Sequence, residues 1–74
     1  MSITVNCFAT LAQYAPPEGA LPQAAGLSVA QTIELLGMPP QLVRTVFVNG
    51  RHAALDAVLN DGDRVGFFPA VAGG

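Results

Sequence analysis

The last residues of the chain, Val71-Ala72-Gly73-Gly74, are the ones whose types and order could support chemistry. Glycine has no Cβ, so a segment ending in two glycines can pass down a channel too narrow for other residues. We expect residues 70–74 to be a flexible tail with a free carboxylate on Gly74. In that case Val71, Ala72 and Gly73 would thread the active site of a partner enzyme, which would modify Gly74. A frayed terminus without a role could have the same sequence. The residues before the tail are therefore needed to distinguish these two interpretations.

Two other side chains, Cys7 and His52, could take part in a reaction or in metal binding. Cys7 stands among apolar residues that alternate along a strand, and a buried thiol without a base or a positive charge stays protonated and inert. One histidine and one inward cysteine do not make a metal-ligand set, so we expect no metal. His52 follows a turn, where a docking role and an exposed histidine without a role are both open.

The size of the chain favours a binding or carrier module over a self-sufficient enzyme. Seventy-four residues form one domain, and a domain this small buries only about 60% of its unfolded surface. An enclosed ligand pocket of about 300–1,000 Å³ would consume most of such a core. With 51% hydrophobic residues, part of the apolar surface should stay exposed and form a partner-binding patch.

Charge and patterning exclude several partners. The chain has three arginines, no lysine and a net charge of −2, whereas nucleic-acid binding needs a basic stripe. No uninterrupted apolar run approaches the ~20 residues of a membrane span, and the first residues lack a signal-peptide pattern. A single cysteine forms no internal disulfide. We therefore expect a cytoplasmic protein that binds neither nucleic acid nor membrane.

The first third of the chain predicts a hairpin. Residues 3–9 alternate, with Ile3, Val5, Cys7 and Ala9 on the core face and Phe8 on the other. Residues 11–22 have a loop composition with a turn at positions 16–19. A second strand is expected near residues 23–27.

Residues 28–37 predict a short helix. Ser28 and Gln31 have the spacing of a capping box, and Val29, Ile33 and Leu36 form one apolar stripe. Gly37 can take the left-handed position that ends the helix.

The last third predicts a second hairpin and a final strand. Residues 45–48 form a strand, Asn49-Gly50 is a strong two-residue turn, and residues 51–53 return antiparallel. After a turn at residues 60–63, residues 64–68 form the last strand. In it Val65 and Phe67 share the core face, and Phe68 lies on the other face.

The order β-β-α-β-β predicts an α+β fold of the β-grasp (ubiquitin-like) type, with a mixed sheet on one main helix. We expect this domain to span residues 1–69. The helix would cover one face of the sheet and leave Phe8 and Phe68 together on the other face. That pairing predicts a docking surface.

These landmarks resemble the ubiquitin-like sulfur-carrier proteins, and most closely the small subunit of molybdopterin synthase (MoaD/ThiS-like). The matching segments are Cys7-Phe8-Ala9, residues 46–50 and the unbroken run from Leu59 to Gly74. The resemblance spans the whole chain, although residues 11–27 match only loosely. Two departures are His52, where relatives carry more apolar residues, and Ala70, where they often have a second proline.

The resemblance implies a chemistry for the tail. An E1-like adenylating enzyme would adenylate Gly74 with ATP, and sulfur from a donor would displace AMP to leave a thiocarboxylate. The carrier itself would bind no cofactor and would not be an enzyme alone. The face with Phe8 and Phe68, with His52 as a further candidate, would dock on the adenylating enzyme and on the large subunit of molybdopterin synthase or another sulfur acceptor.

Several functions stay open at this point. Within the carrier class the sulfur could go to molybdopterin, cysteine, thiamine or a tRNA thiolation system, and the run Phe67-Phe68-Pro69 favours molybdopterin over thiamine. From another class, the chain could be a ubiquitin-like modifier attached to target lysines through Gly74. A third alternative is a plain interaction domain with an idle tail.

Overall fold

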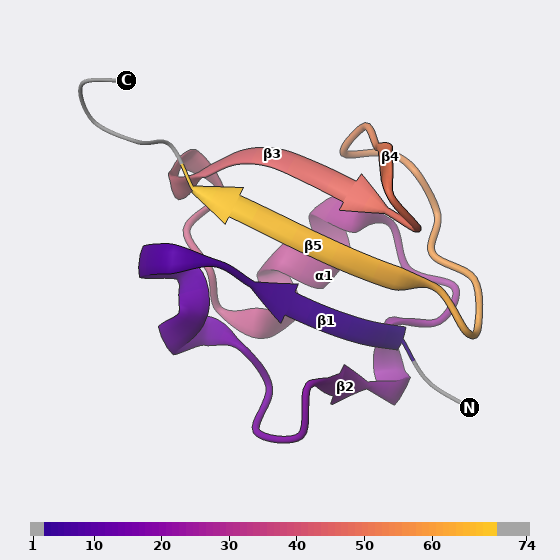
Figure 1. Ribbon diagram of the computed structural model, residues 1–74. Coiled ribbons are helices and arrows are strands. Elements are labelled where there is room, and N and C mark those ends of the chain that lie inside the picture. Colours follow the sequence, from indigo (N-terminus) through magenta and orange to yellow (C-terminus); the bar gives the residue numbers. More distant parts are fainter. Residues whose placement is uncertain (1–2, 70–74) are drawn as a thin grey trace.

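The computed structural model describes residues 3–69 of the chain (Figure 1). The expectations for Val71, Ala72, Gly73 and Gly74 fall outside these described residues. The boundary that we predict between the domain and its tail, after residue 69, stays a prediction.

Five strands form one mixed sheet in the order β2-β1-β5-β3-β4. The central pair, β1 and β5, is parallel, and the other neighbours are antiparallel. Figure 1 shows β5 between β1 and β3, with α1 across one face of the sheet. This arrangement confirms the predicted α+β β-grasp fold. The strands are β1 (Ile3–Cys7), β2 (Ala20–Leu21), β3 (Val43–Val48), β4 (Arg51–His52) and β5 (Arg64–Pro69).

The helix α1 (Val29–Leu36) has the ends that the sequence predicts. The Ser28 side chain accepts a hydrogen bond from the backbone N–H of Gln31 (3.1 Å), and the Gln31 side chain accepts one from the backbone N–H of Ser28 (2.9 Å). Gly37 has a φ of 74° and ends the helix in the left-handed conformation. Val29 and Ile33 are buried, and Leu36 packs against the core.

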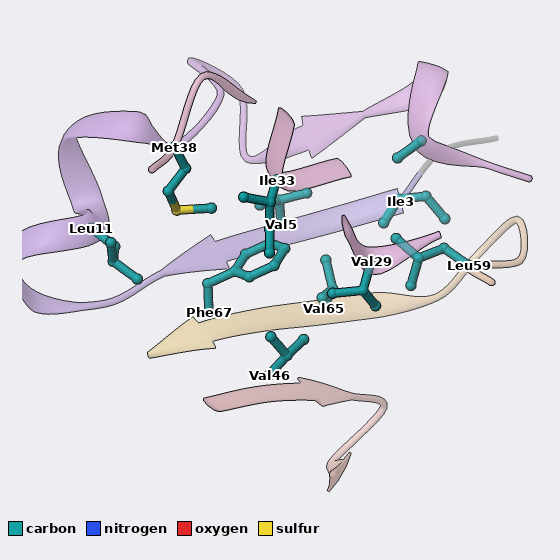
Figure 2. Close-up of a cluster of buried hydrophobic side chains, with 11 residues drawn as sticks. Ile3, Val5, Leu11, Val29, Ile33, Met38, Val46, Leu59, Val65 and Phe67 are labelled. Carbon is teal, nitrogen blue, oxygen red and sulfur yellow. The ribbon is translucent and has the colours of Figure 1, made fainter. Parts of the chain in front are cut away.

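The core lies between α1 and the inner face of the sheet (Figure 2). Val65 and Phe67 of β5 are buried, as is Val46 of β3, which confirms the predicted faces of both strands. Figure 2 shows the Phe67 ring directed into this cluster. Phe67 is the largest of the fully buried side chains.

The predicted first strand is too long. β1 ends at Cys7, and Ala9 is exposed with a φ of 51°, so its predicted place on the core face is wrong. The Phe8 N–H donates to the Phe67 carbonyl (3.1 Å), and the chain then turns away from the sheet. Residues Ala9–Tyr14, predicted in part as loop, form the 3-10 helix η1, which buries Leu11 in the core.

The second strand also differs from the prediction. It covers Ala20–Leu21 instead of residues 23–27, although it pairs with β1 antiparallel as expected. The turn predicted at positions 16–19 is confirmed, because the Gly19 N–H donates to the Pro16 carbonyl (3.0 Å), and the strand starts directly after it. Pro22 then begins the 3-10 helix η2 (Pro22–Ala24), since proline has no N–H with which to continue a ladder.

The β3–β4 hairpin is confirmed. Asn49 and Gly50 both have positive φ (53° and 82°), as a two-residue turn with the twist of a hairpin requires. The Ala53 N–H donates to the Val46 carbonyl (2.9 Å) and extends the pairing by one residue beyond β4. A third 3-10 helix, η3 (Pro40–Leu42), joins α1 to β3. Within residues 3–69 no helix has the length and apolar character required to cross a membrane.

Candidate functional site

Three phenylalanine rings gather on the face of the sheet opposite α1. The Phe8 and Phe68 rings are stacked, with centroids 4.4 Å apart and planes at 8°. The Phe47 ring meets Phe68 edge-on, with a centroid distance of 5.5 Å and planes at 88°. We call Phe8, Phe47 and Phe68 the aromatic patch. Phe8 is 44% exposed, so the patch is open to a partner.

The strand register and one glycine position the aromatic patch. Gly66 of β5 lies between Asn6 of β1 and Phe47 of β3. A Cβ on Gly66 would lie 3.3 Å from the Phe8 ring and 3.5 Å from the Phe68 ring. The first distance is shorter than ordinary van der Waals contact, so the missing side chain at Gly66 lets the two rings stack across β5.

His52 joins the aromatic patch at its β4 side. It lies opposite Phe47 in the hairpin, and the two rings meet edge-on with centroids 4.9 Å apart and planes at 72°. The three predicted docking residues, Phe8, His52 and Phe68, are therefore on one face. We did not predict Phe47 as a docking residue from the sequence, although its position between Val46 and Val48 places it on the same outer face.

An open groove of about 350 Å³ runs beside the aromatic patch. The patch forms its apolar end, Gly66 and its neighbour Asn6 lie in the middle, and its polar end contains Asn49 and Arg64. We did not predict these three polar residues as part of a site. Strand parity puts Asn6 and Arg64 on this face, but the contribution of Asn49 depends on how the two turns meet in space.

A network of hydrogen bonds, which we call the Asn49 clamp, joins the β3–β4 turn to the start of β5. The Asn49 side chain donates from Nδ2 to Asp63 (2.9 Å) and accepts at Oδ1 from the Arg64 N–H (2.9 Å). The other oxygen of Asp63 accepts from the Asn60 N–H (2.8 Å). The clamp thus fixes the polar end of the groove, including the backbone of Arg64.

The Asn49 clamp predicts a pH dependence of stability. The hydrogen bonds from the Asn60 backbone and the Asn49 side chain hold the pKa of Asp63 below its ordinary value of 3.8. A lowered folded-state pKa stabilises the protein above the unfolded-state pKa, and this stabilisation is lost as pH falls through the folded-state pKa. We expect the free energy of unfolding to fall as pH drops below 3.8, with a modest amplitude because the carboxylate faces solvent.

Urea unfolding of Asp63→Asn and of the matched variant Asp61→Asn checks this assignment. Asp61 lies in the same turn without a bond to Asn49 or Asn60 among the hydrogen bonds of the described residues. Asp63→Asn should flatten the acid dependence, and Asp61→Asn should preserve it. Equal slopes in the two variants would assign the acid sensitivity to another group.

Cys7 is half-buried at the end of β1 and packs against the core. Desolvation raises the pKa of its thiol, so it stays protonated and is a poor nucleophile near neutral pH. Within residues 3–69 no three His, Cys, Asp or Glu side chains lie close enough together to hold a metal ion.

The sequence model of the ThiS family matches residues 5–74, nearly the whole chain. None of the curated proteins matches it. The fold is similar to SAMP1 from Haloferax volcanii, with a TM-score of 0.69, 26% identity and full coverage of both chains. It is also similar to the HVO 2177 protein of Haloferax volcanii, with a TM-score of 0.66, 27% identity and coverage of 100% of this chain and 87% of that one.

Urm1 from Trypanosoma brucei is a third similar structure, with a TM-score of 0.68, 25% identity and coverage of 99% of this chain and 95% of that one. These likenesses extend over the whole length of the chain and agree with the family match, which runs through Gly74. The family match and the similar folds lead to one conclusion: the chain belongs to the ThiS family of ubiquitin-like sulfur carriers.

Proposed function

We propose that the chain carries sulfur as a thiocarboxylate on Gly74. The observation that carries this proposal is the path of β5, which supplies Phe68 to the aromatic patch, ends at Pro69 and leads into residues 70–74. Five further residues reach at most about 17 Å, at about 3.4 Å each. A partner docked on the patch would thus have its active site within reach of Gly74, and the family match includes that residue.

The proposed chemistry begins with an E1-like adenylating enzyme. A carboxylate oxygen of Gly74 attacks the α-phosphate of ATP, pyrophosphate leaves, and an acyl adenylate forms. Sulfur from a persulfide donor then attacks the carbonyl carbon, AMP leaves, and reductive cleavage of the sulfur–sulfur bond by a thiol frees the thiocarboxylate. ATP and the sulfur donor are substrates of the partners. This small domain supplies the carboxylate, the tail and the docking face.

For the acceptor we propose the large subunit of molybdopterin synthase, with this chain as the small subunit. Phe67-Phe68-Pro69 before the tail supports this choice. Delivery to cysteine, thiamine or tRNA thiolation, and attachment to proteins as a ubiquitin-like modifier, use the same activation of Gly74. They differ in the molecule that consumes the activated carboxylate.

Intact-protein mass spectrometry tests the proposal. The chain is incubated with ATP, a sulfur source and the adenylating enzyme of the same organism. The expected result is the mass increase of one oxygen-to-sulfur exchange, confined to the C-terminal peptide. No mass change, with an enzyme shown to be active on its own carrier, would overturn the carrier function. Isopeptide-linked conjugates would favour the modifier instead.

A charge in the aromatic patch should weaken docking strongly. Phe68→Asp places a carboxylate against the Phe8 and Phe47 rings, and losing a central aromatic contact typically costs about 2 kcal/mol or more of binding. We expect affinity for the adenylating enzyme to fall at least about 30-fold, since about 1.4 kcal/mol corresponds to a factor of ten. Isothermal titration calorimetry measures this change.

Leu55→Asp is the matched control, because Leu55 is 54% exposed and lies beside α1 on the other side of the molecule. It should leave the affinity within about threefold of wild type. Circular dichroism should show both variants folded. An unfolded Phe68→Asp would mean that Phe68 belongs to the core, and equal affinities would remove the patch from the docking surface.

A further inference from the structure

We infer that the groove beside the aromatic patch binds a carboxylate side chain of the adenylating enzyme through Arg64, next to an apolar side chain held by the patch. This inference rests on the proposed function, because it names the chemistry of the partner surface at the same face. Three features support it: the charge of the groove, the fixed backbone of Arg64, and the hydrogen bonds of the neighbouring Asp63 to groups other than Arg64.

Among residues 3–69, the lining of the groove carries a positive charge. Arg64 is the one charged residue of this described lining, and its other polar side chains are the amides of Asn6 and Asn49. All three arginines of the chain lie in strands and are exposed. The five acidic residues all lie outside the strands, at positions 18, 34, 56, 61 and 63. A complementary partner therefore presents an acidic side chain at this end and an apolar one at the other.

The backbone of Arg64 is held on both sides. Its N–H donates to Asn49 Oδ1 (2.9 Å) and its carbonyl accepts from the Asn49 N–H (2.7 Å). On the other edge it is paired with Thr4 of β1. A guanidinium on a fixed backbone position loses less entropy when it binds, and its planar fork matches a carboxylate better than an ammonium does.

Asp63, the acidic residue next to Arg64 in the sequence, is hydrogen-bonded to other groups. One oxygen of Asp63 accepts from Asn49 Nδ2 (2.9 Å) and the other from the Asn60 N–H (2.8 Å). Both oxygens of Asp63 are thus engaged with amide donors that belong to the Asn49 clamp. Among the side-chain hydrogen bonds of the described residues, none joins the Arg64 guanidinium to Asp63. The guanidinium is thus available to an outside carboxylate, and the Asn6 amide, whose residue lies opposite Gly66, can add a donor beside it.

Charge reversal gives the first test, with binding to the adenylating enzyme measured by calorimetry. Arg64→Glu should weaken binding at least about 30-fold and reduce the salt dependence of the affinity. Arg51→Glu makes the same charge change on an exposed arginine opposite Val48, on the core-face side of the sheet. It should stay within about threefold of wild type. Equal losses in the two variants would overturn the site and indicate a general charge effect.

The absence of lysine from the chain allows a second, more direct test. Arg64→Lys introduces a single lysine side chain at the groove, and a carbodiimide couples an amine to an adjacent carboxylate with loss of a urea. Coupling in the complex, followed by peptide mass spectrometry, should join position 64 to an Asp or Glu of the adenylating enzyme. The matched variant Arg51→Lys should give no such product.

The outcomes separate the inference from the function on which it rests. If the wild-type chain is adenylated but position 64 forms no link, or links to a second copy of this chain, the carboxylate site is wrong and the carrier function stands. If the wild-type chain is not adenylated, yet position 64 links to the enzyme, the site stands and the carrier function is wrong.

Discussion

Adding one alanine after Gly74 is expected to abolish thiocarboxylate formation completely and to leave the thermal unfolding midpoint unchanged. The proposed reaction occurs at the Gly74 carboxylate, and one added residue moves the reacting carbon by about 3.4 Å and places a Cβ in a channel shaped for glycine. A misplacement of 1 Å can reduce an enzymatic rate about 10²-fold. The buried core side chains of the described part of the chain lie within residues 3–67, so we expect stability to depend on them and not on the added residue.

Mass spectrometry after incubation with ATP, sulfur donor and adenylating enzyme measures the loss, and calorimetric unfolding measures stability. The control adds the same alanine before Met1, since β1 begins and β5 ends at opposite ends of the parallel pair. This control should form the thiocarboxylate normally. Full activity of the extended C-terminus would rule out a reaction at Gly74.

Phe67→Ala is expected to destabilise the domain by about 3–5 kcal/mol, the usual cost of removing a buried phenylalanine. Phe67 is completely buried between the sheet and α1. Small domains have about 5–15 kcal/mol of total stability, so the variant would be close to unfolding. Because 1 kcal/mol shifts the midpoint by roughly 4–8 °C in a domain of this size, the midpoint should fall by at least about 12 °C.

The neighbouring residue gives the matched control. Phe68→Ala removes the same atoms from the outer face, where the loss is partly exposed surface and two ring pairs, one stacked and one edge-on, each worth about 0.5–1.5 kcal/mol. Denaturant titrations should therefore separate the two variants clearly. Similar free energies of unfolding would contradict the assignment of the two rings to opposite faces.

Much of this fold could be predicted where local chemistry decides the conformation. The Ser28 and Gln31 cap, the left-handed Gly37 and the Asn49-Gly50 turn depend on neighbours within a few residues. The faces of β5 followed from period-two alternation. The family match confirms the resemblance that the C-terminal run suggested.

The segment between the first strand and the helix was predicted poorly because it has no periodic pattern. A 3-10 turn is too short to show one, and alanine is compatible with several conformations. Leu11 is buried only because η1 packs over the end of the central strands, a contact that sequence neighbours do not specify. Likewise, Ala20 pairs with Thr4 because the turn closes at Gly19.

The site was predicted in part. Parity placed Phe8 and Phe68 on one face, and the stacked rings confirm that geometry, while their docking role stays a prediction. The groove was not predicted, because it depends on register: Asn6, Gly66 and Phe47 lie side by side only when three strands are paired. Arg64 acquires its position from a turn 15 residues earlier in the chain.

The position of β5 has a consequence for biosynthesis. It is the last strand of the described chain, yet it lies in the centre of the sheet and pairs with both β1 and β3. While the ribosome is still making this segment, β1 and β3 have no common neighbour, and the core lacks Val65 and Phe67. Folding of this domain must therefore wait until β5 has been synthesised, and long-range pairing of this kind is slow. A product that ends before β5 would lack Phe68, and with it the complete aromatic patch, as well as the strand that joins β1 to β3.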